Sequence, residues 1–172
     1  MNVTLHQATD ADLPVVRNLV AYYIYDMSRH MGWPCGADGN FGGCDELETY
    51  WIERGRHAFV LRDGDELAGF ALVRGDHEQD DVDYSIGEFF VLGKFRGQGV
   101  GGQAARKLFD RFHGRWMVAQ LADNTPALAF WRKVICRYTK DKYAHSDSQS
   151  PWGPMNEIRF TSTRQPTTRR LS

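Results

Sequence analysis

The sequence has few cysteines, little net charge and no long apolar run. Cys35, Cys44 and Cys136 cannot all pair within one chain and do not have zinc-ligand spacing, so we expect reduced thiols in a cytoplasmic protein. A net charge of −1 provides no overall basic field for nucleic acid or an anionic membrane. No apolar run approaches the roughly 20 residues of a membrane-spanning helix, and the first ten residues lack the pattern of a secretory signal.

The composition is typical of one ordinary domain. A chain of 172 residues with 42% hydrophobic and 25% charged residues can bury a real core. We expect a single domain over residues 1–161 and a flexible, polar tail over residues 162–172. The histidines are not at metal-ligand spacing, so we expect no metal site.

Periodicity and turn residues predict a mixed α/β chain. Strands are expected at residues 3–7, 57–62, 67–73, 84–92, 116–121, 135–143 and 156–161. Helices are expected at residues 13–27, 45–54 and 99–112, and from an N-cap at Thr125 with Pro126 in the first position. Long loops are expected at residues 29–44 and 144–155, and Gly87 indicates a bulge. Hairpins come first and one strand–helix–strand unit follows, which favours the α+β type.

The string RGQGVGG at residues 96–102, here called the glycine segment, is the most informative part of the chain. It leads from a predicted strand directly into a predicted helix, whose first N–H groups have no partner within the helix. Glycine lets that backbone approach a ligand closely, and Arg96 adds a positive charge. The segment therefore predicts a pyrophosphate cradle. A tight turn alone is the structural alternative, but each glycine costs about 1 kcal/mol in regular structure.

The glycine segment can also be compared with two other phosphate-binding patterns. Gly97, Gly99 and Gly102 satisfy the GxGxxG dinucleotide pattern, and Asp123 follows about 20 residues later. A dinucleotide-binding domain needs further parallel strand–helix units, and too little chain follows Asp123 to supply them. The chain contains no GxxxxGK[ST] string, which excludes a P-loop. A dinucleotide-dependent oxidoreductase is therefore kept only as a minor alternative.

Two motifs together resemble a known family. Arg96, Gly99 and Gly101 match [R/Q]xxGx[G/A], the signature of the GNAT superfamily of acetyl-CoA-dependent N-acetyltransferases. The string NTPALAFW at residues 124–131 matches a second family feature, Asn-x-x-Ala-x-x-Phe-Tyr, except in its last residue. The chain is similar to small bacterial members of this superfamily over about residues 3–161.

The resemblance implies a fold and an activity. The expected fold is a central, mixed, mostly antiparallel sheet flanked by helices, with splayed fourth and fifth strands. The expected reaction is direct attack of a primary amine, on a small molecule or a peptide, on acetyl-CoA in a ternary complex. A CoA-binding module without catalysis is the alternative, and the protein is expected to be a monomer or a homodimer.

The resemblance also implies contacts with acetyl-CoA. The amides from about Gln98 to Gly102 would hold the pyrophosphate, and the fourth strand around Val91 would pair with pantetheine. An N–H near Val91 or Leu92 would stabilise the developing oxyanion. The implied set is Phe90, Val91, Leu92, Arg96, Gly97, Gln98, Gly99, Val100, Gly101, Gly102, Asn124, Ala127, Phe130 and Trp131.

The catalytic groups depart from the family pattern. Family members commonly have a tyrosine acid where this chain has Trp131, and an indole N–H cannot replace it. Trp131 then packs on pantetheine or belongs to the core, and Tyr138, Tyr143, a water or no acid at all serves the leaving thiolate. Glu88 is the candidate base, because aromatic neighbours raise the pKa of a carboxyl. The alternative for Glu88 is a solvated carboxylate or a partner for a helix arginine.

The acceptor side is expected around the end of the first long helix. Tyr25, Asp26 and Trp33 are the candidates there, because aromatic rings and a carboxylate suit a cationic amine. Trp152 is a further candidate for the border of the pocket. Tyr23 falls on the apolar stripe of the helix and is expected in the core.

Overall fold

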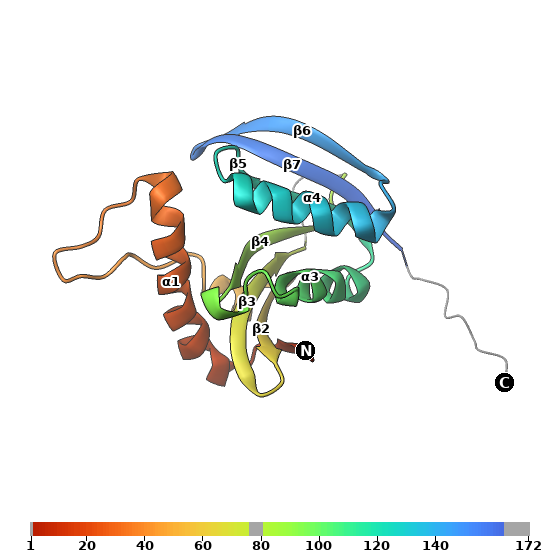
Figure 1. Ribbon diagram of the computed structural model, residues 1–172. Helices are drawn as coiled ribbons and strands as arrows, with labels where there is room; N and C mark the ends of the chain where they lie inside the picture. The colour runs from red at the N-terminus through yellow and green to blue at the C-terminus, as the bar shows by residue number, and fades with distance from the viewer. Residues whose placement is uncertain (1, 76–80, 164–172) are drawn as a thin grey trace.

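A seven-stranded sheet organises the computed structural model, which describes residues 2–75 and 81–163 (Figure 1). Its strands lie in the order β1-β2-β3-β4-β5-β7-β6, and every neighbouring pair within these residues is antiparallel except the parallel pair β4–β5. The strands are β1 (Val3–Gln7), β2 (Arg56–Asp63), β3 (Glu66–Arg74), β4 (Tyr84–Val91), β5 (Gly114–Leu121), β6 (Tyr143–Ser150) and β7 (Gly153–Ser162). This confirms the mixed, mostly antiparallel sheet expected from the sequence.

Helices cover the two faces of the sheet. They are η1 (Asp10–Asp12), α1 (Leu13–Met31), α2 (Thr49–Ile52), η2 (Gly93–Phe95), α3 (Val100–Arg111) and α4 (Thr125–Thr139). Figure 1 shows α1 apart from α3 and α4, with β2–β4 between them. One apolar core joins α3 and α4 to the sheet, and a second joins α1 and the segment that follows it to β2–β4.

The β4–β5 pair is short. Tyr84 pairs with Trp116 and Ser85 with Met117, and the two strands then part. Residues 86–91 of β4 and 118–121 of β5, all within the described chain, do not pair with each other; we call them the splayed edges. The expected splay of the fourth and fifth strands is therefore confirmed.

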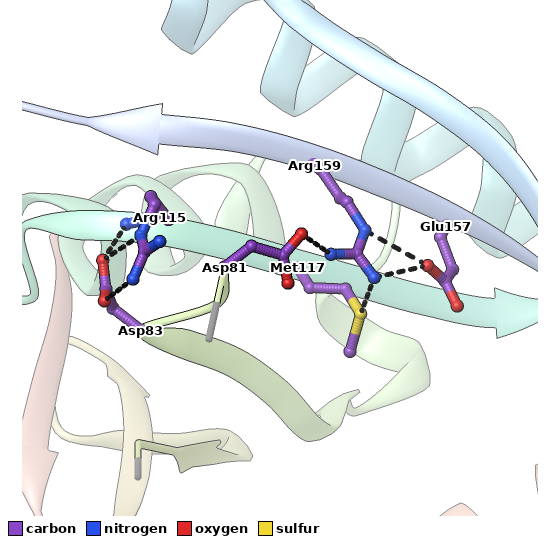
Figure 2. Close-up of polar contacts among 6 residues, drawn as sticks. All are labelled: Asp81, Asp83, Arg115, Met117, Glu157 and Arg159. Carbon is purple, nitrogen blue, oxygen red and sulfur yellow. Dashed lines mark hydrogen bonds and ion pairs between the residues drawn. The ribbon is translucent and has the colours of Figure 1, made fainter. Parts of the chain in front are cut away.

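Ion pairs hold the region where β4 and β5 meet (Figure 2). The Asp83 N–H donates to the Arg115 carbonyl at 2.8 Å, and the Arg115 guanidinium and N–H both donate to the Asp83 carboxylate. These bonds lower the pKa of Asp83 to about 2. Beside them, Arg159 of β7 binds Asp81 and Glu157. The Asp83–Arg115 ion pair, here called the clamp, holds β4 and β5 together at the point from which they diverge.

Register also shifts within β4. Leu72 of β3 pairs with Glu88, and the next residue, Val73, pairs with Ile86, so Gly87 is the extra residue of a bulge. A Cβ on Gly87 would lie 2.2 Å from the Tyr50 hydroxyl oxygen. The bulge expected at Gly87 is confirmed, and glycine lets Tyr50 approach the strand.

Several helix boundaries differ from expectation, and α1 continues to Met31 where an end at residue 27 was expected. The helix expected at residues 45–54 is only α2, because successive i to i−3 bonds, such as Leu47 N–H to the Cys44 carbonyl, wind the preceding segment into turns. The N-cap of α4 is Asn124 instead of Thr125: its Oδ1 accepts from the Ala127 N–H at 3.2 Å. Thr125 is already helical.

The strand expected at residues 135–143 was wrong. α4 continues through this segment to Thr139 and ends at Lys140, which has a left-handed φ of 55°. Val134 and Ile135 are β-branched, but they follow Trp131 by three and four residues, so all three face the core from one side of the helix. The loop expected at residues 144–155 is mostly the β6–β7 hairpin, whose polar strand β6 is held by backbone pairing.

The end of the domain lies slightly later than expected. β7 runs to Ser162, whose hydroxyl donates to the Phe112 carbonyl at 2.8 Å. Ser162, expected in the tail over residues 162–172, is thus the last residue of β7, and residues 164–172 lie outside the described residues.

Gly69 allows β3 to approach the end of β4. Its φ is +156°, and a Cβ there would lie 2.0 Å from the Phe90 carbonyl oxygen. We expect Gly69→Ala to lower the free energy of unfolding by about 2 kcal/mol or more, because rigid backbone must move. Denaturant unfolding would measure this, with Gly42→Ala as the control, since a Cβ on Gly42 meets nothing within 4 Å. Equal stability of the two variants would contradict the expectation.

Candidate active site

The glycine segment forms the start of α3. Gly97 and Gly99 have φ values of 76° and 87°, which favour glycine, and Gly99 is the N-cap. The Gln103 N–H donates to the Gly99 carbonyl at 3.1 Å, as expected for the first bond of an α-helix. The N–H groups of Val100, Gly101 and Gly102 precede that bond and so face out of the helix start. This is the geometry of an anion site.

Three elements meet closely at Gly101. A Cβ there would lie 3.2 Å from the Phe130 ring of α4 and 3.3 Å from the Val91 side chain of β4. Phe130 and Trp131 also contact Phe89 of β4, with ring centroids 5.8 and 5.0 Å apart. Trp131 is only 5% exposed and belongs to the core between the sheet and the helices. The structure shows Trp131 buried in this core, and a contact between Trp131 and pantetheine stays a prediction.

The splayed edge of β4 carries backbone N–H and C=O groups that do not pair with β5. At the end of this edge, the Leu92 N–H donates to the Ala68 carbonyl of β3 at 2.9 Å. In an antiparallel pair successive residues alternate in direction, so the Val91 and Phe89 N–H groups point away from β3, toward β5. Of the two N–H groups expected to face the oxyanion, that of Leu92 is already bound to Ala68, and that of Val91 points toward the gap between β4 and β5.

Arg96 and Asp26 bind each other. The Arg96 Nη2 donates to the Asp26 carboxylate, its Nε donates to the Val91 carbonyl at 2.7 Å, and its guanidinium lies 5.3 Å from the centre of the Phe90 ring. Sequence reasoning placed Arg96 on the cosubstrate and Asp26 on the acceptor. In the structure their ion pair joins α1 to the glycine segment and, through the Arg96–Val91 bond, to the end of β4, and both predicted roles stay predictions.

Glu88 lies on the face of β4 that packs against α1. The Tyr23 hydroxyl donates to its carboxylate, and the Tyr23 ring makes edge contacts with Phe70 and Phe90. Burial raises the pKa of Glu88, and the bond from Tyr23 and the charge of Arg74 only partly offset this. Burial and the adjacent carboxylate raise the pKa of Tyr23 well above its usual value. Tyr23 thus remains a neutral donor to Glu88.

Sequence reasoning missed Tyr23. Helical spacing correctly places it on the buried face of α1, together with Val16 and Val20. It does not show that the phenol would meet a carboxylate from a strand 65 positions later. The hydroxyl of Tyr23 could have indicated a polar contact, since a buried tyrosine hydroxyl usually needs a hydrogen-bond partner.

The expected acceptor residues lie along the C-terminal end of α1 and the segment after it. Tyr25 is 63% exposed, and its ring lies 5.8 Å from that of Phe41. The Trp33 and Trp152 rings lie 6.3 Å apart and nearly perpendicular, so the segment after α1 reaches the β6–β7 turn. Tyr25 and Trp33 thus pack against different aromatic rings, and the hydroxyl bound to Glu88 is that of Tyr23.

The end of α1 also meets the start of α4. The Asn124 amide lies 3.7 Å from the Met27 sulfur, and His30 Nδ1 lies 3.5 Å from the Asp123 carboxylate. Asn124 thus serves both as N-cap of α4 and as a contact of α1. These contacts place α1 beside the splayed end of β5.

Tyr138 lies far from this cluster along α4. Its hydroxyl donates to Asp110, near the end of α3, at 2.9 Å, and its ring contacts Phe109 and Phe160. Burial, followed by the bond to Asp110, raises the pKa of Tyr138 above its usual value. Tyr143 packs against the same core. The structure does not bring either candidate acid together with Glu88.

In residues 2–75 and 81–163, no group of three or more histidine, cysteine, aspartate or glutamate side chains could hold a metal ion. No helix in the same residues is long and apolar enough to cross a membrane.

The raised pKa of Glu88 predicts a pH-dependent stability. A carboxyl whose pKa is higher in the folded than in the unfolded state makes stability fall as pH rises from about 4.5 through the folded value. We expect Glu88→Gln to be more stable than the wild type at pH 7, with the difference vanishing below about pH 4. Urea unfolding between pH 4 and 8 would measure this. The surface variant Glu53→Gln should not reproduce the effect, and a less stable Glu88→Gln at pH 7 would contradict it.

Comparisons with known proteins agree with this architecture. An acetyltransferase from Thermus thermophilus superposes with a TM-score of 0.69 at 15% identity, over 94% of this chain and 97% of its own. The aminoglycoside acetyltransferase AAC(6′)-Ib, solved with ribostamycin and coenzyme A, gives 0.66 at 19% identity over the whole of both chains. A variant of the spermidine N-acetyltransferase SpeG from Vibrio cholerae gives 0.63 at 12% identity over 94% of each chain.

At such low identities these structures show the fold alone. No protein with a curated description matches the chain significantly. The family model described as acetyltransferase (GNAT) family matches residues 24–135, a span that contains the glycine segment and most of α4. The chain therefore belongs to the GNAT acetyltransferase family.

Proposed function

We propose that the protein transfers an acetyl group from acetyl-CoA to a primary amine. The observation that carries this proposal is the position of the α3 start directly beside the splayed edge of β4. An anion cradle and an unpaired strand edge fit the two ends of one ligand, a diphosphate joined to an extended amide chain. The neighbours solved with coenzyme A support this choice of ligand.

The proposed reaction is a direct transfer. The amine nitrogen attacks the thioester carbonyl carbon, a C–N bond forms as the C–S bond breaks, and CoA leaves as thiolate. The extra proton that the nitrogen carries after attack passes through solvent to the departing thiolate. The Val91 N–H would stabilise the negative charge on the carbonyl oxygen, because it points toward the splayed side of β4. No side-chain acid is assigned, since Trp131 is buried in the core and Tyr138 is bound to Asp110.

We propose Glu88 as the base that takes the proton from the incoming ammonium group. Burial keeps its proton affinity above that of an ordinary carboxyl, which suits proton transfer near neutral pH. Tyr23 would orient the carboxylate through its hydroxyl. Both groups lie on the α1 face of the sheet. Val91 is the last residue of β4, and the thioester would lie beside its N–H.

The acceptor is proposed to be a cationic small molecule or peptide amine. Two of the neighbours are named for aminoglycosides and spermidine, both of which carry amines. Tyr25 and Trp33 would contribute aromatic walls for such a cation. The three free cysteines suit a cytoplasmic location, and a monomer or homodimer is proposed.

Acetyl-CoA should be consumed, with release of free thiol, in the presence of a panel of primary amines. We expect Glu88→Gln to lower kcat roughly 100-fold. Tyr23→Phe removes a donor that lowers the pKa of Glu88, so the acidic limb of the rate profile should move to higher pH. Glu53→Gln serves as the control. Unchanged turnover and pH profile in Glu88→Gln would reject it as the base, and CoA binding without turnover of any amine would support the non-catalytic alternative.

Asp26→Asn tests whether Asp26 serves the acceptor or the glycine segment. Because Asp26 is bound to Arg96, we expect the variant to weaken CoA binding about 5-fold while the KM of the amine stays within a factor of two. Steady-state kinetics with both substrates varied would measure this. A rise confined to the KM of the amine would instead place Asp26 in the acceptor pocket.

A further inference from the structure

A group of polar side chains lies against the Gly87 bulge of β4. A Cβ on Gly87 would lie 2.2 Å from the Tyr50 hydroxyl oxygen and 3.4 Å from the Arg74 Nε, so both atoms lie directly over this residue. The Arg74 Nε donates to the Tyr50 hydroxyl at 2.8 Å, and its Nη2 donates to the Glu46 carboxylate at 3.1 Å. Gly87 immediately precedes Glu88 in the strand, so these groups gather beside the proposed base.

The group lies on the same face of the sheet as Glu88. Leu72 of β3 pairs with Glu88 and belongs to the core beneath α1, which also contains Tyr50. Arg74 follows Leu72 by two residues and therefore lies on the same face of β3. From α1, the Tyr23 hydroxyl donates to the Glu88 carboxylate. Glu88 is thus bound by a phenol from α1 and shares its face of the sheet with the guanidinium of Arg74.

Of the groups that face Glu88 in the described chain, two are charged near neutral pH. The titratable and charged groups around it are Tyr23 of α1, Cys44 and Glu46 of the segment before α2, Tyr50 of α2, and Arg74 of β3. Burial raises the pKa of both phenols and of the Cys44 thiol, which therefore stay neutral. Arg74 and Glu46 remain, and they are bound to each other. Glu88 therefore meets one positive and one negative charge, whose effects on it are opposite.

The neighbours of the Arg74–Glu46 pair favour the positive charge. Arg56 of β2 donates from Nη1 to the Glu46 Oε2 at 3.2 Å, and this is the same oxygen that Arg74 binds. One carboxylate oxygen is thus shared by two guanidinium groups, so Glu46 cannot fully offset the charge of Arg74. Tyr50 is only 4% exposed, and the Arg56 guanidinium lies 5.3 Å from the centre of its ring. These contacts hold Tyr50, and with it Arg74, against the bulge.

We propose that Arg74 is a positioning residue for the reaction, whose charge holds the buried Glu88 as a carboxylate, and that Glu46 limits this effect. This rests on the proposed function, because it assigns a further residue to the base of that reaction. A carboxyl withdrawn from water favours its neutral form, which cannot take a proton from an ammonium group. A guanidinium is always protonated, and its charge favours the ionised carboxyl. The bulge makes room for this arrangement, since a side chain at Gly87 would displace the Tyr50 hydroxyl.

The test uses two substitutions that should act in opposite directions. Arg74→Gln removes the positive charge, so we expect the pKa of Glu88 to rise by about 0.5 units or more. Glu46→Gln removes the opposing negative charge, so we expect the pKa of Glu88 to fall by a similar amount. Carbon-13 NMR titration of the glutamate carboxyl groups in the unliganded full chain would measure both. The Glu88 signal is assigned by its absence in Glu88→Gln.

The pH profile of the rate gives a second readout, which a merely structural role would not move in this way. For Arg74→Gln, kcat/KM of the amine should fall about threefold on the acidic limb, the equivalent of about 0.5 pKa units, and recover at high pH. Arg74→Lys keeps the charge and should move the profile less than half as far. The matched controls are Arg17→Gln and Glu48→Gln, which break an exposed ion pair of α1 and should change neither readout.

Several results would overturn the proposal. Shifts of the same sign in Arg74→Gln and Glu46→Gln, or no shift in either, would exclude the effect of the two charges on Glu88. An Arg74→Lys profile displaced as far as that of Arg74→Gln would show that the charge is not the cause. If Arg74→Gln does not fold, Glu46→Gln decides alone, and the absence of its downward shift rejects the proposal.

Failure of the proposed function gives a different result. If Glu88→Gln acetylates the amine with the wild-type pH profile, Glu88 is not the base and the role of Arg74 in the reaction fails with it. The NMR titration needs no cosubstrate, so it still separates this case from one in which Arg74 has no effect on Glu88. Opposite NMR shifts without any change in the rate profile would likewise reject Arg74 as a positioning residue.

Discussion

β4 and β5 run side by side for only two residue pairs, and this limit organises the site around them. Parting two strands leaves backbone N–H and C=O groups that must find other partners. At the end of β4, the Arg96 guanidinium supplies one of them by donating to the Val91 carbonyl. At the other end, the Asp83–Arg115 clamp keeps the strands together. The sheet can open at one end because it is held at the other.

The opened sheet also separates two chemical tasks. Strand alternation turns Phe89 toward α3 and α4, where the glycine segment lies, and turns Glu88 toward α1. The start of α3 and the Glu88 carboxylate therefore lie on opposite faces of the same strand. If they shared a face, the negative charge of a diphosphate would raise the pKa of Glu88 further and hinder its ionisation. The Arg96–Asp26 pair is the contact that joins the two faces at the strand end.

The glycine segment and the order of most elements were predictable from the sequence because they depend on local backbone constraints. Gly97 and Gly99 adopt positive φ at the start of a helix, and Gly87 forms a bulge. The errors came from residues whose environment is set by distant parts of the chain. Ile135 is β-branched but packs at helical spacing, and the polar strand β6 is fixed by its pairing with β7.

The same division applies to the candidate site. The motif located Arg96, but not that its guanidinium would meet Asp26, because that contact joins residues 70 positions apart. Helix periodicity placed Tyr23 in the core and could not reveal its bond to Glu88. Spacing likewise gave no reason to reject Tyr138 as an acid. Its hydroxyl is bound to Asp110 and is not beside Glu88, which follows only from the packing of α4 against α3.

Glu88 and Gln120 have one property in common that explains why they are informative. Each is a polar side chain largely withdrawn from water, and each costs folding stability that an apolar residue would not. They lie on the two strands that part: Glu88 of β4 is bound by Tyr23 of α1, and Gln120 of β5 donates to Asn156 of β7. Proteins commonly tolerate such local costs where a ligand or a reaction repays them. The stability lost at these two positions therefore falls on the two strands that part from each other, β4 and β5.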